Sequence, residues 1–458
     1  MKKAFYIISS VLLAILSAIF VIWLLDQNKI SVPSAVVAAI SVFAFGALLV
    51  LFVYMLLKDW FNSDAEPQIM DLGRQGRFWS RHPWGKIIIW MVASRILIFV
   101  LAYMVDLIAN GYDGGIFERM QTLWLRSDSP SYLGIAKNWY VTEGDPRFHI
   151  VFFPFYPMVL KVFQLVVGDY FAAAMLTSFT CSIGAAIVLY ELAAIDMSRR
   201  DALRAVRYMF ILPAAFFFTS PMTESLFLLL TVSCMLLIRK KKYLWAGLIG
   251  ALAAFTRSIG IMMIVPMGIE AIRDVIRMYR EGSGKKLKSI AARLGGLLII
   301  PLGLGAYVLI NYLVTGNPLQ FMEYQWDHWH QRMGLFFNTV SYETSYFLRA
   351  LNDMELKTAW GLWFPGLVYI FGTLAVMIAA ARRMRSSYTG YFIAYFIMAV
   401  GPTWLLSAPR YLTAAFPVAI ALSALTGGKR RYDIIATVVC IIGFILFMSA
   451  NVLGWPVY

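Results

Sequence analysis

Residues 33–57 read PSAVVAAISVFAFGALLVLFVYMLL, a run of twenty-five residues without one charged side chain. A helix of about 20 apolar residues is long enough to cross the hydrocarbon core of a bilayer. A surface helix of a soluble protein instead carries polar residues along one face. The run therefore predicts a membrane-spanning helix.

The composition of the whole chain agrees with this stretch. Of the 458 residues, 60% are hydrophobic and only 14% are charged, and the mean hydropathy is +0.71. Soluble domains carry about 25% charged residues, so this balance excludes a soluble, disordered or coiled-coil protein. The three cysteines, Cys181, Cys234 and Cys440, lie in apolar runs and imply no disulfide framework.

Further apolar runs extend the pattern along the chain and predict an all-α, polytopic transmembrane bundle of about thirteen membrane helices. The expected spans are 4–25, 33–57, 88–108, 169–194, 207–219, 221–238, 243–256, 258–272, 291–314, 360–382, 388–407, 410–427 and 432–451. The spans between 207 and 272 are short and turn at 220–221 and 256–258. Short helices cannot cross a thick bilayer alone, so we expect their outer ends to line a water-filled recess.

The basic residues indicate the orientation. The chain has 40 Lys and Arg against 25 Asp and Glu, a net charge of +15, and most basic residues fall on one side of the predicted bundle. Cytoplasmic loops are enriched in Lys and Arg. The N-terminus and the clusters 239–242, 285–286 and 429–431 are therefore predicted to be cytoplasmic, beside anionic membrane lipids. The cytoplasmic enrichment in Lys and Arg thus explains the net charge of +15, and we expect no nucleic-acid partner.

The same topology divides the chain into three regions. Residues 1–60 are expected to form a two-helix N-terminal extension, and 61–87 a polar cytoplasmic linker. Residues 88–451 form the main membrane domain. Its two long loops, 109–168 and 315–358, are expected outside, and any chemistry is expected on that side.

The first outer loop predicts two helices on the membrane surface. Asp128 or Ser129 before Pro130 is typical of a helix start, because Asp and Ser cap free N–H groups and proline suits the first turn. One face of this helix would carry Tyr132, Ile135, Ala136, Trp139 and Tyr140. The second surface helix is expected over 154–167, since a crossing there would place Arg199 and Arg200 outside.

Six short motifs follow one another between residues 85 and 430. They are Asp128 with 132–137, 152–157, 213–217 leading to 223–227, 256–258, 316–319 and 407–412. Together they resemble the PIG-V-type mannosyltransferases, the GPI mannosyltransferase II family and its bacterial relatives within the GT-C glycosyltransferases. The chain departs from this pattern at Ser127, where the family usually has tryptophan.

The resemblance implies a GT-C-like enzyme with an extracytoplasmic active site, in the plasma membrane if the chain is bacterial. Such an enzyme transfers a hexose, most often mannose, with inversion. The donor is a polyprenyl-phosphate sugar, and the acceptor is a hydroxyl of a lipid or glycan. An acceptor hydroxyl is a poor nucleophile and needs a carboxylate as general base. Asp128 is the candidate, with helix capping as its alternative role.

Arg257 and Arg410 are the candidates for binding the donor phosphate. Each is predicted at an outer turn between apolar runs, and arginine binds phosphate through two parallel hydrogen bonds. The alternative is that each side chain only snorkels to the membrane interface. Arg95 differs because it lies within the third span, where we predict an ion pair with Glu191.

The other substrate-binding candidates are Tyr132, Glu224, Trp326, Asp327 and His328. Aromatic rings beside carboxylates suit sugar recognition, but the residues of the second outer loop equally suit a membrane-surface belt. Glu224 equally suits a helix cap. His328 and His330 hint at a metal, but the spacing offers no third ligand. We expect no cofactor and no metal.

A different class, a transporter or flippase of an anionic lipid or lipid-linked sugar, would also suit an outward cavity with arginines. Transporters commonly have inverted repeats and sites near the membrane midplane. The candidates here gather at the outer boundary, which favours the glycosyltransferase.

Overall fold

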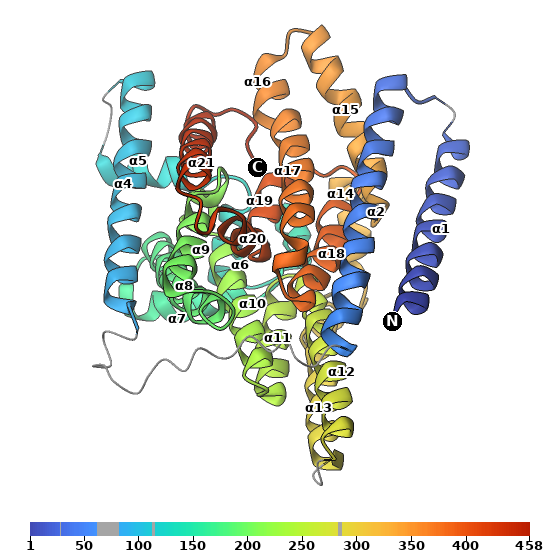
Figure 1. Cartoon of the computed structure of the whole chain (residues 1–458). Helices are drawn as coiled ribbons and strands as arrows, with labels where there is room; N and C mark the ends of the chain where they lie inside the picture. The colour runs from blue at the N-terminus through green and yellow to red at the C-terminus, as the bar shows by residue number, and fades with distance from the viewer. Residues whose placement is uncertain (28, 62–81, 112–114, 283–285) are drawn as a thin grey trace.

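The computed structural model describes residues 1–27, 29–61, 82–111, 115–282 and 286–458. Within these ranges every regular element is a helix, as Figure 1 shows, and the only strand-like pairing is an isolated bridge between Met333 and Pro402. The predicted all-α class is confirmed.

Seven helical segments of the described residues are long and apolar enough to cross a membrane. They are α1 (Lys2–Asp26), α2 (Val32–Phe61), α4 (Trp84–Asn110), α8 (Tyr170–Ala193), α13 (Lys286–Thr315), α17 (Phe364–Ala380) with its flanking turns, and α21 (Arg430–Val452). The turns flanking α17 are α16 (Leu356–Thr358), η4 (Ala359–Trp363) and η5 (Ala381–Arg383). Outward-facing side chains such as Ile89, Leu298 and Leu446 are apolar and more than half exposed, as contact with lipid tails requires. The chain is an integral membrane protein.

The remaining predicted spans are formed by helices of 17 residues or fewer. These are α9 (Arg199–Ile211), α10 (Glu224–Arg239), α11 (Tyr243–Thr256), α12 (Ile264–Arg280), α18 (Ser386–Val400), α19 (Ala408–Thr413) and α20 (Pro417–Thr426), with the 3₁₀ turns η2 (Ala215–Phe218) and η3 (Ser258–Met263). The short helices expected between 207 and 272 are therefore present, and the count of about thirteen membrane helices stays a prediction. The predicted turn at 256–258 is present, because α11 ends at Thr256.

Two of the predicted spans differ in extent from the helices that the structure forms. Helix α18 stops at Val400 instead of 407 because Pro402 lacks an N–H and restricts the residue before it. Helix α9 was expected as an apolar span over 207–219. It is instead an amphipathic helix that ends at Ile211, and Arg207 Nη2 lies 2.5 Å from Asp433 Oδ1.

Helix α11 packs very closely against α13. A Cβ atom added to Gly303 would lie 1.9 Å from the carbonyl oxygen of Ala251, and one added to Gly247 would lie 2.5 Å from that of Gly296. Small residues let membrane helices approach at backbone distance. This contact fixes the direction in which the C-terminal end of α11 points.

The first outer loop contains α5 (Ile116–Trp124), α6 (Ser129–Asn138), η1 (Asp145–Val151) and α7 (Phe155–Val167). Both helices expected there are present at the predicted positions, and η1 and α7 meet at a bend of 109°. Tyr132, Ile135 and Ala136 are buried as predicted. Trp139 is 41% exposed, because α6 ends one residue earlier and the backbone turns away at φ +62.

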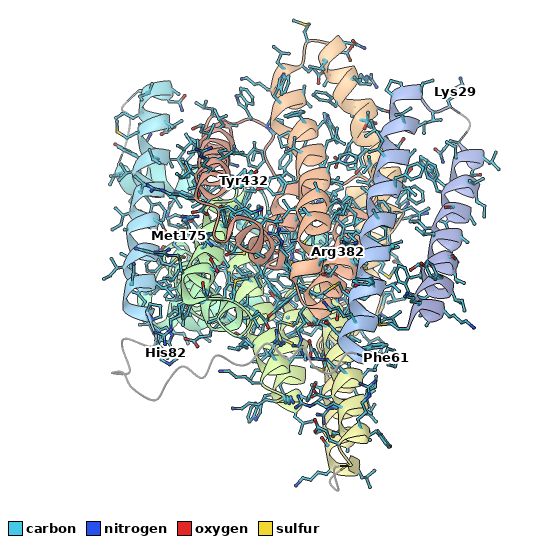
Figure 2. The ribbon with its side chains drawn as sticks, viewed as in Figure 1. Lys29, Phe61, His82, Met175, Arg382 and Tyr432 are labelled. Carbon is cyan, nitrogen blue, oxygen red and sulfur yellow. The ribbon has the colours of Figure 1, made fainter. Side chains whose placement is uncertain are left out.

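The second outer loop contains α14 (Gln320–Trp329) and α15 (Phe336–Asn352). Helices α1 and α2 lie side by side at one edge of the bundle in Figure 1, and α2 packs on α15 and α17. Of the predicted linker 61–87, residues 62–81 lie outside the described residues. The residues that flank them, Phe61 and His82, lie at the same end of the bundle, opposite Lys29 (Figure 2).

The predicted ion pair between Arg95 and Glu191 is wrong. Glu191 instead accepts hydrogen bonds from Trp84 Nε1 (2.7 Å) and the His82 ring (2.8 Å). Arg95 lies eleven residues beyond Trp84, about 16 Å farther along α4. Its guanidinium is buried over the Phe210 ring and has no hydrogen-bond partner among the described residues.

The end of the bundle that carries the basic loops is held together by buried ion pairs. Arg239 pairs with Asp196, and its Nη1 donates to the Tyr388 hydroxyl at 2.9 Å. Arg385 Nε lies 2.5 Å from Glu270 Oε1. Arg239 was expected beside anionic lipid with its cluster 239–242, but its side chain is only 5% exposed. Arg239 therefore serves packing, not lipid contact.

Candidate active site

Four charged side chains from four separate segments meet at the opposite end of α10 from Arg239. Arg410 Nη2 lies 2.7 Å from Asp128 Oδ2, and Arg410 Nε lies 3.5 Å from Glu224 Oε1. Arg257 Nη1 lies 2.5 Å from the same Glu224 oxygen. We call these four residues the charged cluster. In it, each arginine touches Glu224, and Arg410 joins Glu224 to Asp128.

The loop before α6 positions Asp128. Arg126 donates hydrogen bonds to the carbonyl oxygens of Asn451 and Val452 and so ties the loop to the end of α21. Ser127 follows with φ +52, a left-handed conformation that turns the chain sharply. Asp128 is at the N-cap position, but its side chain makes no capping hydrogen bond. The capping alternative for its carboxylate is therefore wrong in this structure.

The two arginines are held by short turns between apolar segments. Arg257 terminates α11 in an extended conformation, and its Nη1 donates to the Thr223 hydroxyl at 3.0 Å. Arg410 lies in α19, one turn after Ser407, and its Nη2 lies 3.3 Å from the Ser407 hydroxyl. The Tyr411 ring packs against both guanidinium groups, with centroid distances of 4.6 Å to Arg257 and 5.2 Å to Arg410.

Burial distinguishes the members of the charged cluster. The side chains of Glu224 and Arg410 are 2% and 4% exposed, whereas the Asp128 side chain is 31% exposed. Glu224 Oε2 and Arg410 Nε lack a hydrogen-bond partner among the described residues. A buried arginine does not snorkel, so that alternative is wrong for Arg410. The charged cluster is therefore closed to solvent around Glu224 and accessible from outside the protein at Asp128.

Tyr132 lies beside the charged cluster on α6. Burial raises the pKa of its phenol, and the negative charge of Asp128 raises it further. The hydroxyl is therefore protonated at neutral pH and is a hydrogen-bond donor. Its ring packs edge-on against Phe152 and Tyr156, with centroids 5.2 and 5.4 Å away, which fixes its orientation.

The chemistry available to the charged cluster follows from its groups. Two guanidinium groups offer several N–H donors to an anion, and an accessible carboxylate beside them can accept a proton. Within the described residues, no three His, Cys, Asp or Glu side chains are grouped closely enough to hold a metal ion. The cluster therefore combines groups that can bind an anion with a group that can accept a proton.

The second-loop candidates do not reach the charged cluster. Trp326 lies under the guanidinium of Arg332, 3.4 Å from its ring centroid, and Asp327 is exposed. His328 instead stacks on Phe148 of the first outer loop at 4.3 Å. The residues that line a pocket there are Ser131, Asp145, Pro146, Phe148, His149, His328 and Trp329.

Sequence reasoning missed most of this pocket, to which we refer as the loop pocket. One signal was available: the chain has only four histidines, and the two long outer loops contain three of them. His149 and His328 meet at the loop pocket. His149 is half-buried, and burial lowers its pKa below the usual value. Burial thus favours the neutral form of its imidazole.

No known family model matches the chain, and no curated protein matches it. Solved structures of similar helix arrangement include ArnT from Cupriavidus metallidurans bound to undecaprenyl phosphate, with 14% identity and a TM-score of 0.45 over 79% of this chain and 77% of that one. The Archaeoglobus fulgidus oligosaccharyltransferase in the apo form has 11% identity and a TM-score of 0.40, over 78% of this chain and 56% of that chain.

A third similar structure is Archaeoglobus fulgidus AglB in complex with an inhibitory peptide and a dolichol-phosphate. It has 10% identity and a TM-score of 0.37, over 82% of this chain and 56% of that chain. The chain therefore spans little more than half the length of these oligosaccharyltransferases. At such identities a shared activity does not follow from the likeness, and the PIG-V-type family remains a prediction.

Proposed function

We propose that this protein is a membrane glycosyltransferase that transfers a hexose, most often mannose, from a polyprenyl-phosphate donor to an acceptor hydroxyl on the extracytoplasmic face. The observation that carries the proposal is the charged cluster. Arg410 pairs with Asp128 at 2.7 Å, and Arg257 approaches from another segment through Glu224. Two arginines, which could bind the donor phosphate, thus lie next to an accessible carboxylate.

In the proposed reaction, the donor phosphate binds to Arg257 and Arg410. Asp128 takes the proton of the acceptor hydroxyl as its oxygen attacks the anomeric carbon of the sugar. The bond from that carbon to the phosphate oxygen breaks, and polyprenyl phosphate leaves with one more negative charge. The guanidinium groups stabilise this charge where it develops. Attack opposite the leaving group inverts the configuration.

Glu224 has a positioning role in this scheme. Its buried Oε1 contacts both arginines, at 2.5 Å from Arg257 and 3.5 Å from Arg410. A carboxylate at this place holds two like charges close together, which their mutual repulsion opposes. Asp128 shares Arg410 with Glu224. When the donor phosphate accepts hydrogen bonds from the Arg410 guanidinium in place of Asp128, the Asp128 carboxylate becomes free to act as a base.

A transfer assay separates the proposal from a transporter. Purified protein in nanodiscs, given polyprenyl-phosphomannose and membrane-extracted acceptor lipids, is expected to release polyprenyl phosphate and form a mannosylated product. A transporter or flippase would leave the donor chemically intact. In sealed vesicles it would move the lipid between leaflets. Movement without release of polyprenyl phosphate would contradict the proposal.

The proposed orientation predicts a labelling pattern. Glu143 and Met354 are exposed residues of the two outer loops, and the side chain of Lys241 is 53% exposed at the basic end. With Glu143→Cys or Met354→Cys, intact cells should react with an impermeant maleimide. Lys241→Cys should react only after permeabilisation. The native cysteines are buried, so their background is low. The reverse pattern would overturn the orientation.

A further inference from the structure

The loop pocket lies between α6, η1 and α14. It has a volume of about 330 Å³, within the range of about 300 to 1,000 Å³ of small-molecule sites. It draws on both long outer loops, because Phe148 stacks on His328 and Trp329 stands edge-on to Phe152 at 5.9 Å. The cavity is thus built from segments that are far apart in the sequence.

The wall formed by η1 is fixed in place. The Tyr307 hydroxyl donates to the Ile150 carbonyl at 2.6 Å, and the Tyr140 hydroxyl donates to that of Phe152 at 2.5 Å. His149 packs on the backbone of α6, where a Cβ atom on Gly134 would lie 3.5 Å from its Cε1. The pocket is therefore formed in advance of binding and loses little conformational entropy when a ligand enters.

The groups that line the loop pocket suit a neutral polyhydroxylated ring. Trp329 offers an apolar ring to C–H groups, while the Asp145 carboxylate and the His149 imidazole can form hydrogen bonds with hydroxyls. Phe148 supports this wall, because His328 and the Arg147 guanidinium cover its two faces at 4.3 Å each.

Among the described residues, the charged side chain that lines the loop pocket is the Asp145 carboxylate. The nearby Arg147 guanidinium lies over the Phe148 ring and donates to the Gly144 carbonyl at 3.0 Å. The lining therefore suits a neutral ligand better than an anion.

The loop pocket is adjacent to the proposed base. Ser131 lines it, and Ser131 follows Asp128 by three residues at the start of α6. Side chains three residues apart on a helix are neighbours at about 5 to 6 Å between Cβ atoms. Asp128 pairs with Arg410, and the loop pocket begins at Ser131, three residues farther along the chain. A general base needs its acceptor hydroxyl within hydrogen-bond reach.

From this arrangement we propose that the loop pocket binds a hexopyranose unit of the acceptor and directs one of its hydroxyls to Asp128. The acceptor is then a glycan or a glycosylated lipid. The inference rests on the proposed function for the role of the bound sugar. Sugar binding itself depends on Asp145, His149 and Trp329, none of which belongs to the charged cluster.

Saturation-transfer NMR tests the binding without any turnover. The probes are methyl α-mannopyranoside and methyl α-glucopyranoside, added to the full-length protein in nanodiscs. At least one should receive saturation from the wild-type protein. Trp329→Ala and Asp145→Asn should each weaken that binding by about 10-fold, which corresponds to about 1.4 kcal/mol. Absence of saturation transfer to the wild-type protein would overturn the proposal.

The matched control is Trp360→Ala, which removes a tryptophan that is 47% exposed on η4, away from the loop pocket. It should bind the probes as the wild type does, and melting temperatures check that all variants fold. Equal binding by Trp329→Ala and the wild type would also overturn the proposal. Probe binding by a protein that never releases polyprenyl phosphate would contradict the proposed function but not the sugar site.

Discussion

Asp128→Asn is expected to lower the rate of sugar transfer by about 100- to 10,000-fold, the usual contribution of general-base catalysis. Asparagine keeps the size of the side chain and one oxygen for Arg410, but it cannot take the acceptor proton. The melting temperature should change little, because the Asp128 side chain makes no capping hydrogen bond and Arg410 keeps its pairing with Glu224. Donor binding should persist, because Arg257 and Arg410 are unchanged. Transfer and donor affinity are measured on the same preparation.

A matched control for this substitution is available at the start of α8. Asp169 is a true capping residue, because its carboxylate accepts a hydrogen bond from the Ala172 N–H at 2.8 Å. Asparagine caps helices about as well as aspartate, so Asp169→Asn should leave both stability and transfer near normal. Near-normal transfer by Asp128→Asn would show that Asp128 is not the general base.

Arg410→Gln and Arg257→Gln are each expected to weaken binding of polyprenyl phosphate by about 10- to 150-fold. A hydrogen bond to a charged group contributes on the order of 1.5 to 3 kcal/mol, which converts to this range. Loss of Arg410 also leaves the buried Glu224 with one arginine fewer. Removing one partner of a buried ion pair costs about 3 to 5 kcal/mol of stability, so affinity is measured on folded protein only.

A second variant separates ligand binding from folding. Arg257→Gln with Glu224→Gln removes a buried pair together and keeps the net charge, so its donor affinity should stay low while its stability recovers. The control at the other end of the bundle is Arg239→Gln with Asp196→Asn. That variant should keep the donor affinity of the wild type. Equal donor affinity in all variants would reassign both cluster arginines to a structural role.

The sequence was most informative where polar residues interrupt apolar runs. Arg257 and Arg410 were predicted at turns because apolar segments flank them; in the structure Arg257 ends α11, and Arg410 lies within the six-residue helix α19. Their meeting with Asp128 could not be derived from local pattern, since tertiary packing brings the four segments together. The order of the family-like motifs gave the only indication of it.

Other features depended on details that periodicity does not report. The short lengths of α10 and α11 were predicted, but hydropathy could not show that α18 ends at Val400, because its apolar run continues through the turn that ends it. The predicted pairing of Arg95 with Glu191 is wrong because the two side chains lie at different positions along their packed helices. The sequence does not specify how far one helix is shifted along the other. The loop pocket depends on contact between two distant loops, so Asp145 and His149 carried no local signal.

An experimental structure of the protein with a polyprenyl-phosphate sugar bound would show directly whether the charged cluster is the active site. We expect phosphate oxygens about 2.7 to 3.2 Å from the guanidinium nitrogens of Arg257 and Arg410. We also expect the anomeric carbon of the sugar on the side of Asp128. A phosphate bound elsewhere, with the Arg410 to Asp128 and Arg257 to Glu224 pairs unchanged, would contradict the central claim.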